Sequence, residues 1–128
     1  MNDDARQDLS KRDVKHAVKE ALDELLGLGE VRMAARFSGG TVVIRPAKSD
    51  TQEKVIPIDV LFHKITMVRD RLRVLEQRIN SHARLSAEDK VELQQYVTRA
   101  YGSLTSFNVL FRDRADWFMG SAGGGQDD

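Results

Sequence analysis

Cysteine is absent from the 128 residues of this chain. Its absence excludes disulfide bonds, thiol nucleophiles and cysteine-ligated zinc sites. Long apolar runs are absent too, and none approaches the roughly 18–20 residues that a membrane-spanning helix needs. The opening residues, MNDDARQDLS, carry no apolar stretch of the kind found in signal peptides. We therefore expect a cytoplasmic protein with no membrane partner.

The chain also lacks net charge, because 20 Lys and Arg residues balance 20 Asp and Glu residues. Neutralising phosphate charge is the usual main source of affinity for nucleic acid, so this balance argues against a dedicated nucleic-acid binder. The charge is unevenly distributed, however: residues 31–84 are mildly basic and both ends are acidic. A chain of this length fits one domain with its own hydrophobic core.

The pattern of the first thirty residues predicts a short polar arm followed by a helix. Residues 1–9 are polar and are expected to be flexible. Ser10 is a good N-cap, and apolar residues then recur at helical spacing up to Leu25. Gly27 can take the left-handed conformation that ends many helices. We predict a helix over residues 10–26.

Residues 30–57 change to a period of two, which predicts a short antiparallel β-meander of two to three strands. Gly39 and Gly40 are expected to form a two-residue hairpin turn, since glycine accepts the positive φ of such turns. That register places Phe37 opposite Val42. After a polar loop, EKVIP is predicted as a short further strand that ends at Pro57.

Residues 58–119 are predicted to form a long antiparallel α-helical hairpin. In the first helix, apolar residues repeat at alternating spacings of three and four, which is a heptad seam. This predicted seam consists of Ile58, Leu61, Ile65, Val68, Leu72, Leu75 and Ile79. Ser86 begins the second helix, whose seam is Leu93, Val97, Ala100, Leu104, Phe107, Phe111 and Phe118. The fold class is therefore α+β, with one domain over residues 10–119 and a flexible, glycine-rich tail over residues 120–128.

A second apolar row, Val60, Met67 and Val74, lies beside the predicted seam of the first long helix. The apolar surface is thus wider than one partner helix needs. This row could be covered by the protein's own N-terminal helix, or it could form a homodimer interface. A nucleic-acid surface is a third interpretation.

Basic residues form two predicted surfaces that could bind an anion or an acidic partner protein. Arg32, Arg36 and Arg45 are expected on one face of the sheet, which carries no aromatic residue for stacking on bases. Lys64, Arg71 and Arg78 share one heptad position on the first long helix. Nucleic-acid binding would need both groups on one continuous surface.

Gly102 is unusual because it interrupts a helical pattern, in the stretch YGSLTSFN. Glycine there costs about 1 kcal/mol relative to alanine. One interpretation is a kink or break between Gly102 and Ser106. The other is close approach of another helix over Gly102 and Ser106, which would add them to the oligomer interface.

No arrangement of residues predicts catalysis or a cofactor. The three histidines, at positions 16, 63 and 82, have no second ligand at metal-binding spacing. FSGGT lacks the Lys-Ser/Thr ending of a phosphate-binding loop, and no G-x-S-x-G motif occurs. We expect a non-enzymatic protein-interaction or scaffold protein, homodimeric through its helical hairpin, without metal or cofactor. The alternative is a nucleic-acid-binding or regulatory module that uses the basic residues.

Overall fold

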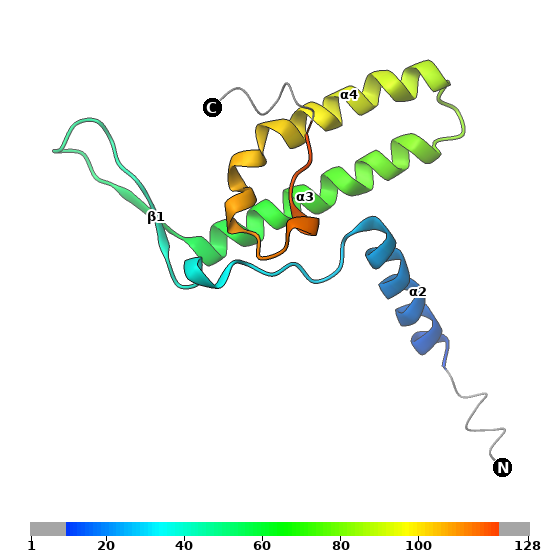
Figure 1. Ribbon diagram of the computed structural model, residues 1–128, viewed down its shortest axis with the longest axis horizontal. Coiled ribbons are helices and arrows are strands. Elements are labelled where there is room, and N and C mark those ends of the chain that lie inside the picture. Colours follow the sequence, from blue (N-terminus) through cyan, green and yellow to red (C-terminus); the bar gives the residue numbers. More distant parts are fainter. Residues whose placement is uncertain (1–9, 121–128) are drawn as a thin grey trace, which may run out of the picture. The chain divides into compact units, whose positions relative to one another are not determined.

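The computed structural model describes residues 10–120, and these have the predicted α+β fold (Figure 1). An N-terminal helix precedes a two-stranded antiparallel hairpin and two long packed helices. The helices and strands are α2 (Lys11–Leu26), β1 (Thr41–Ile44), β2 (Lys54–Pro57), α3 (Ile58–Ser81) and α4 (Ala87–Ser103). Three 3₁₀ turns are η1 (Ala35–Phe37), η2 (Thr105–Leu110) and η3 (Arg114–Asp116). The chain divides into two compact units, Met1–Glu30 and Val31–Asp128.

Helix α2 has the start and the end that its sequence predicts. The Ser10 side chain accepts a hydrogen bond from the backbone N–H of Asp13, at 3.3 Å. At the other end Gly27 has a φ of 69°, the left-handed conformation, and its N–H bonds to carbonyl groups of the last turn. Both ends are thus satisfied by residues next to the helix. The predicted flexible arm, residues 1–9, lies outside the described residues.

The predicted hairpin about Gly39 and Gly40 is wrong. The segment before it forms no strand with β1; instead Met33 pairs with Phe111 in an isolated antiparallel bridge. The N–H of Ala34 bonds to the carbonyl of Leu110 at 2.8 Å, so this backbone is satisfied by a distant segment. Alternation along residues 31–37 cannot reveal such a partner. Gly39 does turn the chain, with φ 78°, but the turn leads from η1 into β1.

The two strands of the sheet are β1 and the predicted last strand, β2. Their register pairs Thr41 with Pro57 and Val42 with Ile56. A salt bridge of 2.6 Å between Arg45 and Glu53 closes the base of the polar loop between the strands. The hairpin extends away from the helix pair (Figure 1).

The second long helix is shorter than predicted. Helix α4 ends at Ser103, whereas the sequence pattern extended it to residue 119. The break falls within the stretch where Gly102 suggested one, and the Thr105 hydroxyl donates to the carbonyl of Gly102 at 3.0 Å. The chain then folds back through η2 and η3. The buried Asn108 holds this return by bonding both the N–H and the carbonyl of Phe118, at 2.7 and 3.0 Å.

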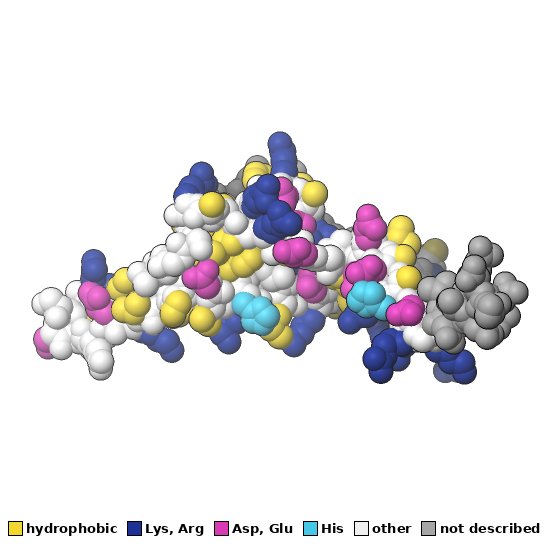
Figure 2. Space-filling view, turned by 90° about the horizontal axis from the view of Figure 1, so that it is seen from below, with side chains coloured by type: hydrophobic (Ala, Val, Ile, Leu, Met, Phe, Trp, Pro, Cys, Tyr) yellow, Lys and Arg dark blue, Asp and Glu magenta, His cyan; other side chains and the backbone are white. Residues whose placement is uncertain are grey.

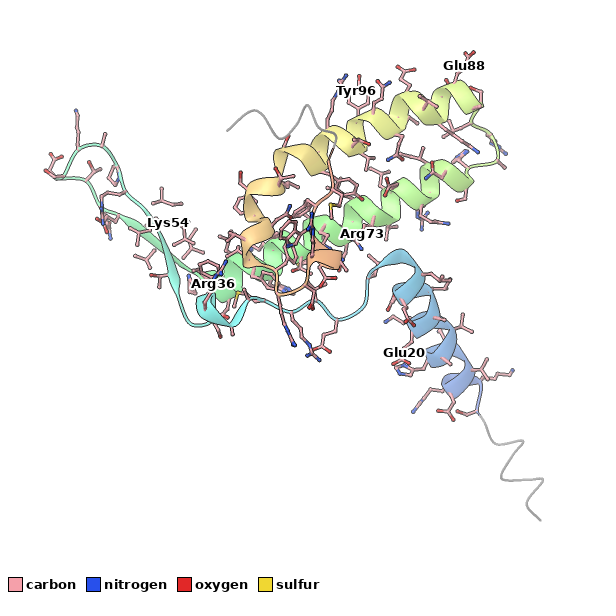
Figure 3. The ribbon with its side chains drawn as sticks, in the orientation of Figure 1. Glu20, Arg36, Lys54, Arg73, Glu88 and Tyr96 are labelled. Atoms are coloured by element: carbon pink, nitrogen blue, oxygen red, sulfur yellow. The ribbon has the colours of Figure 1, made fainter. Side chains whose placement is uncertain are left out.

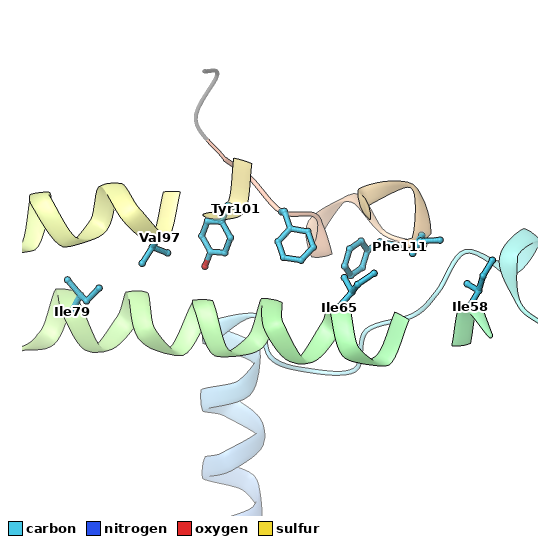
Figure 4. Packing of buried hydrophobic residues seen from close by; sticks show 8 residues of the cluster. Ile58, Ile65, Ile79, Val97, Tyr101 and Phe111 are labelled. Atoms are coloured by element: carbon cyan, nitrogen blue, oxygen red, sulfur yellow. The ribbon is translucent and has the colours of Figure 1, made fainter. Parts of the chain in front are cut away.

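The hydrophobic core lies between α3, α4 and the returning C-terminal segment (Figure 4). Its aromatic part is a chain of ring contacts. Phe62 meets Phe111 at 5.3 Å between ring centres, and Phe111 meets Phe118 at 5.8 Å. The buried apolar residues are Ile58, Ile65, Ile79, Val97, Tyr101, Leu110, Phe111 and Phe118. All of them belong to the unit that begins at Val31.

Candidate docking surface on the first long helix

The face that α3 buries matches its heptad pattern only in part: Ile58, Ile65 and Ile79 are in the core, and Leu61 and Leu72 pack against it. Two seams are possible from Ile58 to Ile79, and the predicted one runs through Val68 and Leu75. In the structure these two residues are exposed, and Arg69 is buried beside the core. The observed seam is therefore Ile58, Phe62, Ile65, Arg69, Leu72, Glu76 and Ile79. The prediction was wrong here because it required every seam residue to be apolar.

Arg69 is fully enclosed, and its guanidinium joins α3 to the C-terminal segment. Its Nε donates to the backbone carbonyl of Asp116 at 2.8 Å, and its Nη2 lies 3.3 Å from the carboxylate of Asp116. The neighbouring Asp70 accepts from Nη1 at 2.6 Å. Burial lowers the pKa of Arg69 from its ordinary value, and the nearby Arg73 adds to this, while the two carboxylates oppose the shift. The two carboxylates offset the cost of removing the charged guanidinium from water.

Glu76 forms a second polar contact in the seam, this time with α4. Its carboxylate accepts from the Gln94 amide at 2.5 Å and from the Tyr101 hydroxyl at 3.2 Å. Burial and, after it, the negative charge of Glu76 together raise the pKa of Tyr101 to about 12. The phenol can donate this hydrogen bond only while it holds its proton. Arg69 and Glu76 therefore fix how α3 packs, and neither forms part of an open site.

Because α3 buries the face with Arg69 and Glu76, its opposite face carries exposed apolar residues. Val60 is 46% exposed and Leu75 is 47% exposed, and Met67 and Val68 are also exposed. Val74 is half-buried. Helical spacing groups these residues into two rows, one of Val60, Met67 and Val74 and the other of Val68 and Leu75.

A basic row runs between the two apolar rows. It consists of Lys64, Arg71 and Arg78, spaced seven apart and all exposed. The long aliphatic stems of these residues can lie on apolar surface while their charged ends reach water. We call this basic row and the two apolar rows the outer face of α3. In the view of Figure 2, hydrophobic side chains lie exposed among Lys and Arg side chains.

The other predicted basic surface is not formed as expected. Arg32 lies in the segment paired with the C-terminal return, and its carbonyl accepts from the N–H of Arg112 at 2.8 Å. The guanidinium of Arg36 lies over the Phe37 ring at 5.0 Å, and Arg45 is paired with Glu53. The three arginines share no sheet face, since the strand that would have aligned them is absent. Figure 3 shows Arg36 beside the β-hairpin and Arg73 farther along α3.

The remaining predicted interface residues lie at the break after α4. Ser106 is exposed in η2, whereas Gly102 is buried. A Cβ atom built on Gly120 would overlap the backbone of Gly102 and lie 3.0 Å from the carbonyl carbon of Tyr101. The close approach at Gly102 is therefore made by the chain's own C-terminal segment. This contact fills the space that a second helix would need over Gly102.

The described residues offer no arrangement for metal binding. Among residues 10–120, no group of three or more His, Cys, Asp or Glu side chains is placed to hold a metal ion. His16 pairs with Glu20 at 3.1 Å on α2, and both side chains are exposed. No helix in the same part of the chain is long and apolar enough to span a membrane.

Sequence reasoning missed the buried Arg69 and Asn108 and the half-buried Glu76 as polar residues of the packed interior. One signal for Arg69 and Glu76 is present in the sequence. The spacing that joins Ile58, Ile65, Leu72 and Ile79 is equally compatible with Phe62, Arg69 and Glu76 as the intervening positions. Asn108 gives no local signal, because its partner Phe118 lies beyond a change of chain direction.

The chain is a small α+β protein, and the outer face of α3 carries exposed apolar residues. Residues 28–117 match the family described as Domain of unknown function (DUF8685), and the chain belongs to this family. No curated protein and no solved structure matches the chain. The matched range contains β1, β2, α3 and α4, and it begins after the end of α2.

Proposed function

We propose that this protein is a non-enzymatic interaction module and that the outer face of α3 is its docking surface. The observation that carries this proposal is the row of three cations held between two exposed apolar rows. Exposed apolar side chains that gather on one face, rimmed by polar groups, are typical of surfaces that bind another protein. An amphipathic helix laid along α3 would bury both apolar rows at once.

The charge of the outer face favours an acidic partner helix. Lys64, Arg71 and Arg78 would oppose carboxylates on such a helix, and electrostatic complementarity of this kind gives specificity and fast association. In a symmetric pairing over the whole face, the same three cations would meet their own copies. An acidic partner helix can therefore cover the whole outer face, including its central basic row, without bringing like charges together.

A second copy of the chain is the second candidate occupant, and the position of one apolar row favours it. Val60, Met67 and Val74 lie to one side of the basic row, so two copies could pair along this row alone. This is the homodimer expected from the sequence. A substitution of Met67→Asp tests it directly, since it should then give a folded monomer.

The proposal is tested with synthetic helical peptides. One peptide carries leucine on one face and glutamate on its flanks, and the matched peptide replaces each glutamate with lysine. We expect the acidic peptide to bind at least tenfold more tightly in fluorescence anisotropy. Met67→Asp should abolish this binding, and Arg71→Glu should reverse the preference between the peptides.

The matched control variant is Val91→Asp, because Val91 is an exposed apolar residue on α4, at 61% against 36% for Met67. It should bind the acidic peptide as the wild type does. Equal binding of the two peptides would contradict the proposed partner. Undiminished binding by Met67→Asp would contradict the proposed surface.

A further inference from the structure

Helix α2 carries a second exposed apolar surface, and its charges are arranged in a way that the outer face of α3 does not share. The helix has 16 residues. Its exposed apolar residues are Val14, Val18, Leu22 and Leu25, and Leu25 is 83% exposed. Helices of this length are marginal in water by themselves, and most gain their stability from packing an amphipathic face.

Among the side chains that the structure describes, the buried core residues and the hydrophobic residues packed against them lie between Val31 and Phe118. The family match also begins at residue 28, after the helix has ended. Helix α2 has its own N-cap at Ser10 and its own left-handed end at Gly27. It is therefore a separately delimited helix added to the shared domain.

The apolar residues of α2 have a heptad spacing. Val14, Val18, Ala21 and Leu25 follow one another at spacings of four, three and four. This is the seam of a two-stranded coiled coil over about two heptads. Leu22 widens the seam on one side.

The residues beside this seam are sorted by charge. The residues that directly precede seam positions include Asp13, Glu20 and Glu24. The residues that directly follow seam positions include Lys15 and Lys19. Since successive residues turn by about 100° around a helix, the acids lie on one flank of the seam and the lysines on the other; Lys15 and Glu24 are next to the seam, and Asp13, Glu20 and Lys19 lie farther from it.

This sorting decides how two copies of α2 can pair. In a parallel pair the acidic flank of each helix faces the basic flank of its partner. In an antiparallel pair each flank faces its own kind, so lysines meet lysines and carboxylates meet carboxylates. Charges beside a coiled-coil seam are known to set partner choice and orientation.

We propose that α2 joins two copies of this protein as a parallel, in-register helical pair through Val14, Val18, Ala21 and Leu25. Two heptads make a short interface, so the dimer is reversible and dependent on protein concentration. Self-association then resides in α2, and the outer face of α3 stays open for a different partner. This inference does not depend on the function proposed for α3.

The absence of cysteine allows the orientation to be measured on the full chain. In a parallel pair Val14 faces its own copy, so Val14→Cys should form a disulfide-linked dimer under mild oxidation. In an antiparallel pair the two copies of residue 14 would lie about 16 Å apart along the axis, because Val14 would face Leu25 and the rise is about 1.5 Å per residue. His16→Cys is the control, since helical spacing places His16 opposite the seam.

Analytical ultracentrifugation of full-length variants tests the surface. The wild type should show a mass that rises with concentration, and Val18→Asp should weaken self-association at least tenfold. Met67→Asp should leave it unchanged, which separates this site from α3. The double variant Lys15→Glu, Lys19→Glu, which reverses the charge of the basic flank, should form a weaker homodimer. Mixing it with the double variant Glu20→Lys, Glu24→Lys should restore association.

Three results would overturn the proposal. The first is a wild type that stays monomeric at the highest soluble concentration. The second is a dimer that Met67→Asp disrupts and Val18→Asp does not. The third is cross-linking of Val14→Cys no faster than that of His16→Cys. This result overturns the parallel pair whether or not a mixture of Val14→Cys and Leu25→Cys chains, which tests an antiparallel pair, forms cross-links. A normal thermal melt of Val18→Asp would show that its effect is not a failure to fold.

Discussion

The side chain of Arg69 on α3 reaches the backbone carbonyl and the carboxylate of Asp116, at 2.8 and 3.3 Å. This contact joins the middle of the longest helix to a segment near the end of the described chain. It occupies a seam position at which an apolar residue would be expected. Breaking it leaves buried polar groups without partners, which is more costly than losing one surface ion pair.

Arg69→Ala is therefore expected to lower the free energy of unfolding by about 3 kcal/mol or more. Arg71→Ala is the matched control, because Arg71 lies two residues away on the exposed outer face and should change it by less than about 0.5 kcal/mol. Urea unfolding followed by circular dichroism measures both. Similar losses in the two variants would show that the enclosed guanidinium has no special role.

The pKa of Tyr101 leads to a dependence of stability on alkaline pH. Burial and the charge of Glu76 raise the folded-state pKa to about 12, above the ordinary value of 10.0. The folded state therefore holds the phenol proton more tightly, so its stabilising contribution is complete below pH 10. It is lost as the pH rises from 10 towards 12, by up to about 2–3 kcal/mol.

Tyr101→Phe removes the titrating group and should flatten this part of the stability profile. Urea unfolding at pH 9, 10 and 11 measures the slope in both proteins, and other titrating groups contribute equally to both. Tyr96→Phe is the control, because Tyr96 is exposed on α4. A profile of Tyr101→Phe parallel to that of the wild type would count against the Tyr101–Glu76 contact.

Gly120→Ala is expected to destabilise the protein by about 1–3 kcal/mol, since the new methyl group would meet backbone rather than a movable side chain. The nearest atoms are the Cα and N of Gly102. Gly29→Ala is the control, because a Cβ atom there has nothing within 4 Å. Thermal melts of the two variants give the comparison, and an unchanged melting temperature for Gly120→Ala would contradict the close contact.

Nucleic acid is expected to bind weakly and to be released by moderate salt. The outer face of α3 offers the three cations Lys64, Arg71 and Arg78. On duplex DNA each phosphate contact contributes about 0.9 to the slope with which the logarithm of the binding constant falls against the logarithm of the salt concentration. Anisotropy with labelled duplex and single strands at two salt concentrations measures this. Submicromolar, salt-resistant binding that is lost in Arg32→Ala with Arg36→Ala would instead favour a nucleic-acid function.

The elements that could be predicted are those whose signals are local. Helix α2 begins at its Ser10 cap and ends at Gly27, and both signals lie within one turn of the helix. The strand at Lys54–Pro57 and the start of α4 after Ser86 were predicted for the same reason. The α+β class follows from these elements together.

The features that could not be predicted depend on partners far away in the chain. The segment around Met33 alternates as a strand does, yet its backbone pairs with Phe111 rather than with β1. The seam of α3 was misassigned because an enclosed Arg69 is favourable only once Asp116 is in place. The sequence placed Val60 and Met67 in a second apolar row and Val68 and Leu75 in the seam, and all four are exposed.

The bridge between Met33 and Phe111 has a consequence for how the protein is made. Hydrogen bonds from Ala34 to Leu110 and from Arg112 to Arg32 close a loop that contains almost the whole family domain. During synthesis the early segment leaves the ribosome long before its partner exists. The nascent chain can form α2 and the β-hairpin, because their contacts are local. It cannot complete its core until Phe118 has emerged, so folding of this domain finishes only after its last core residue has left the ribosome.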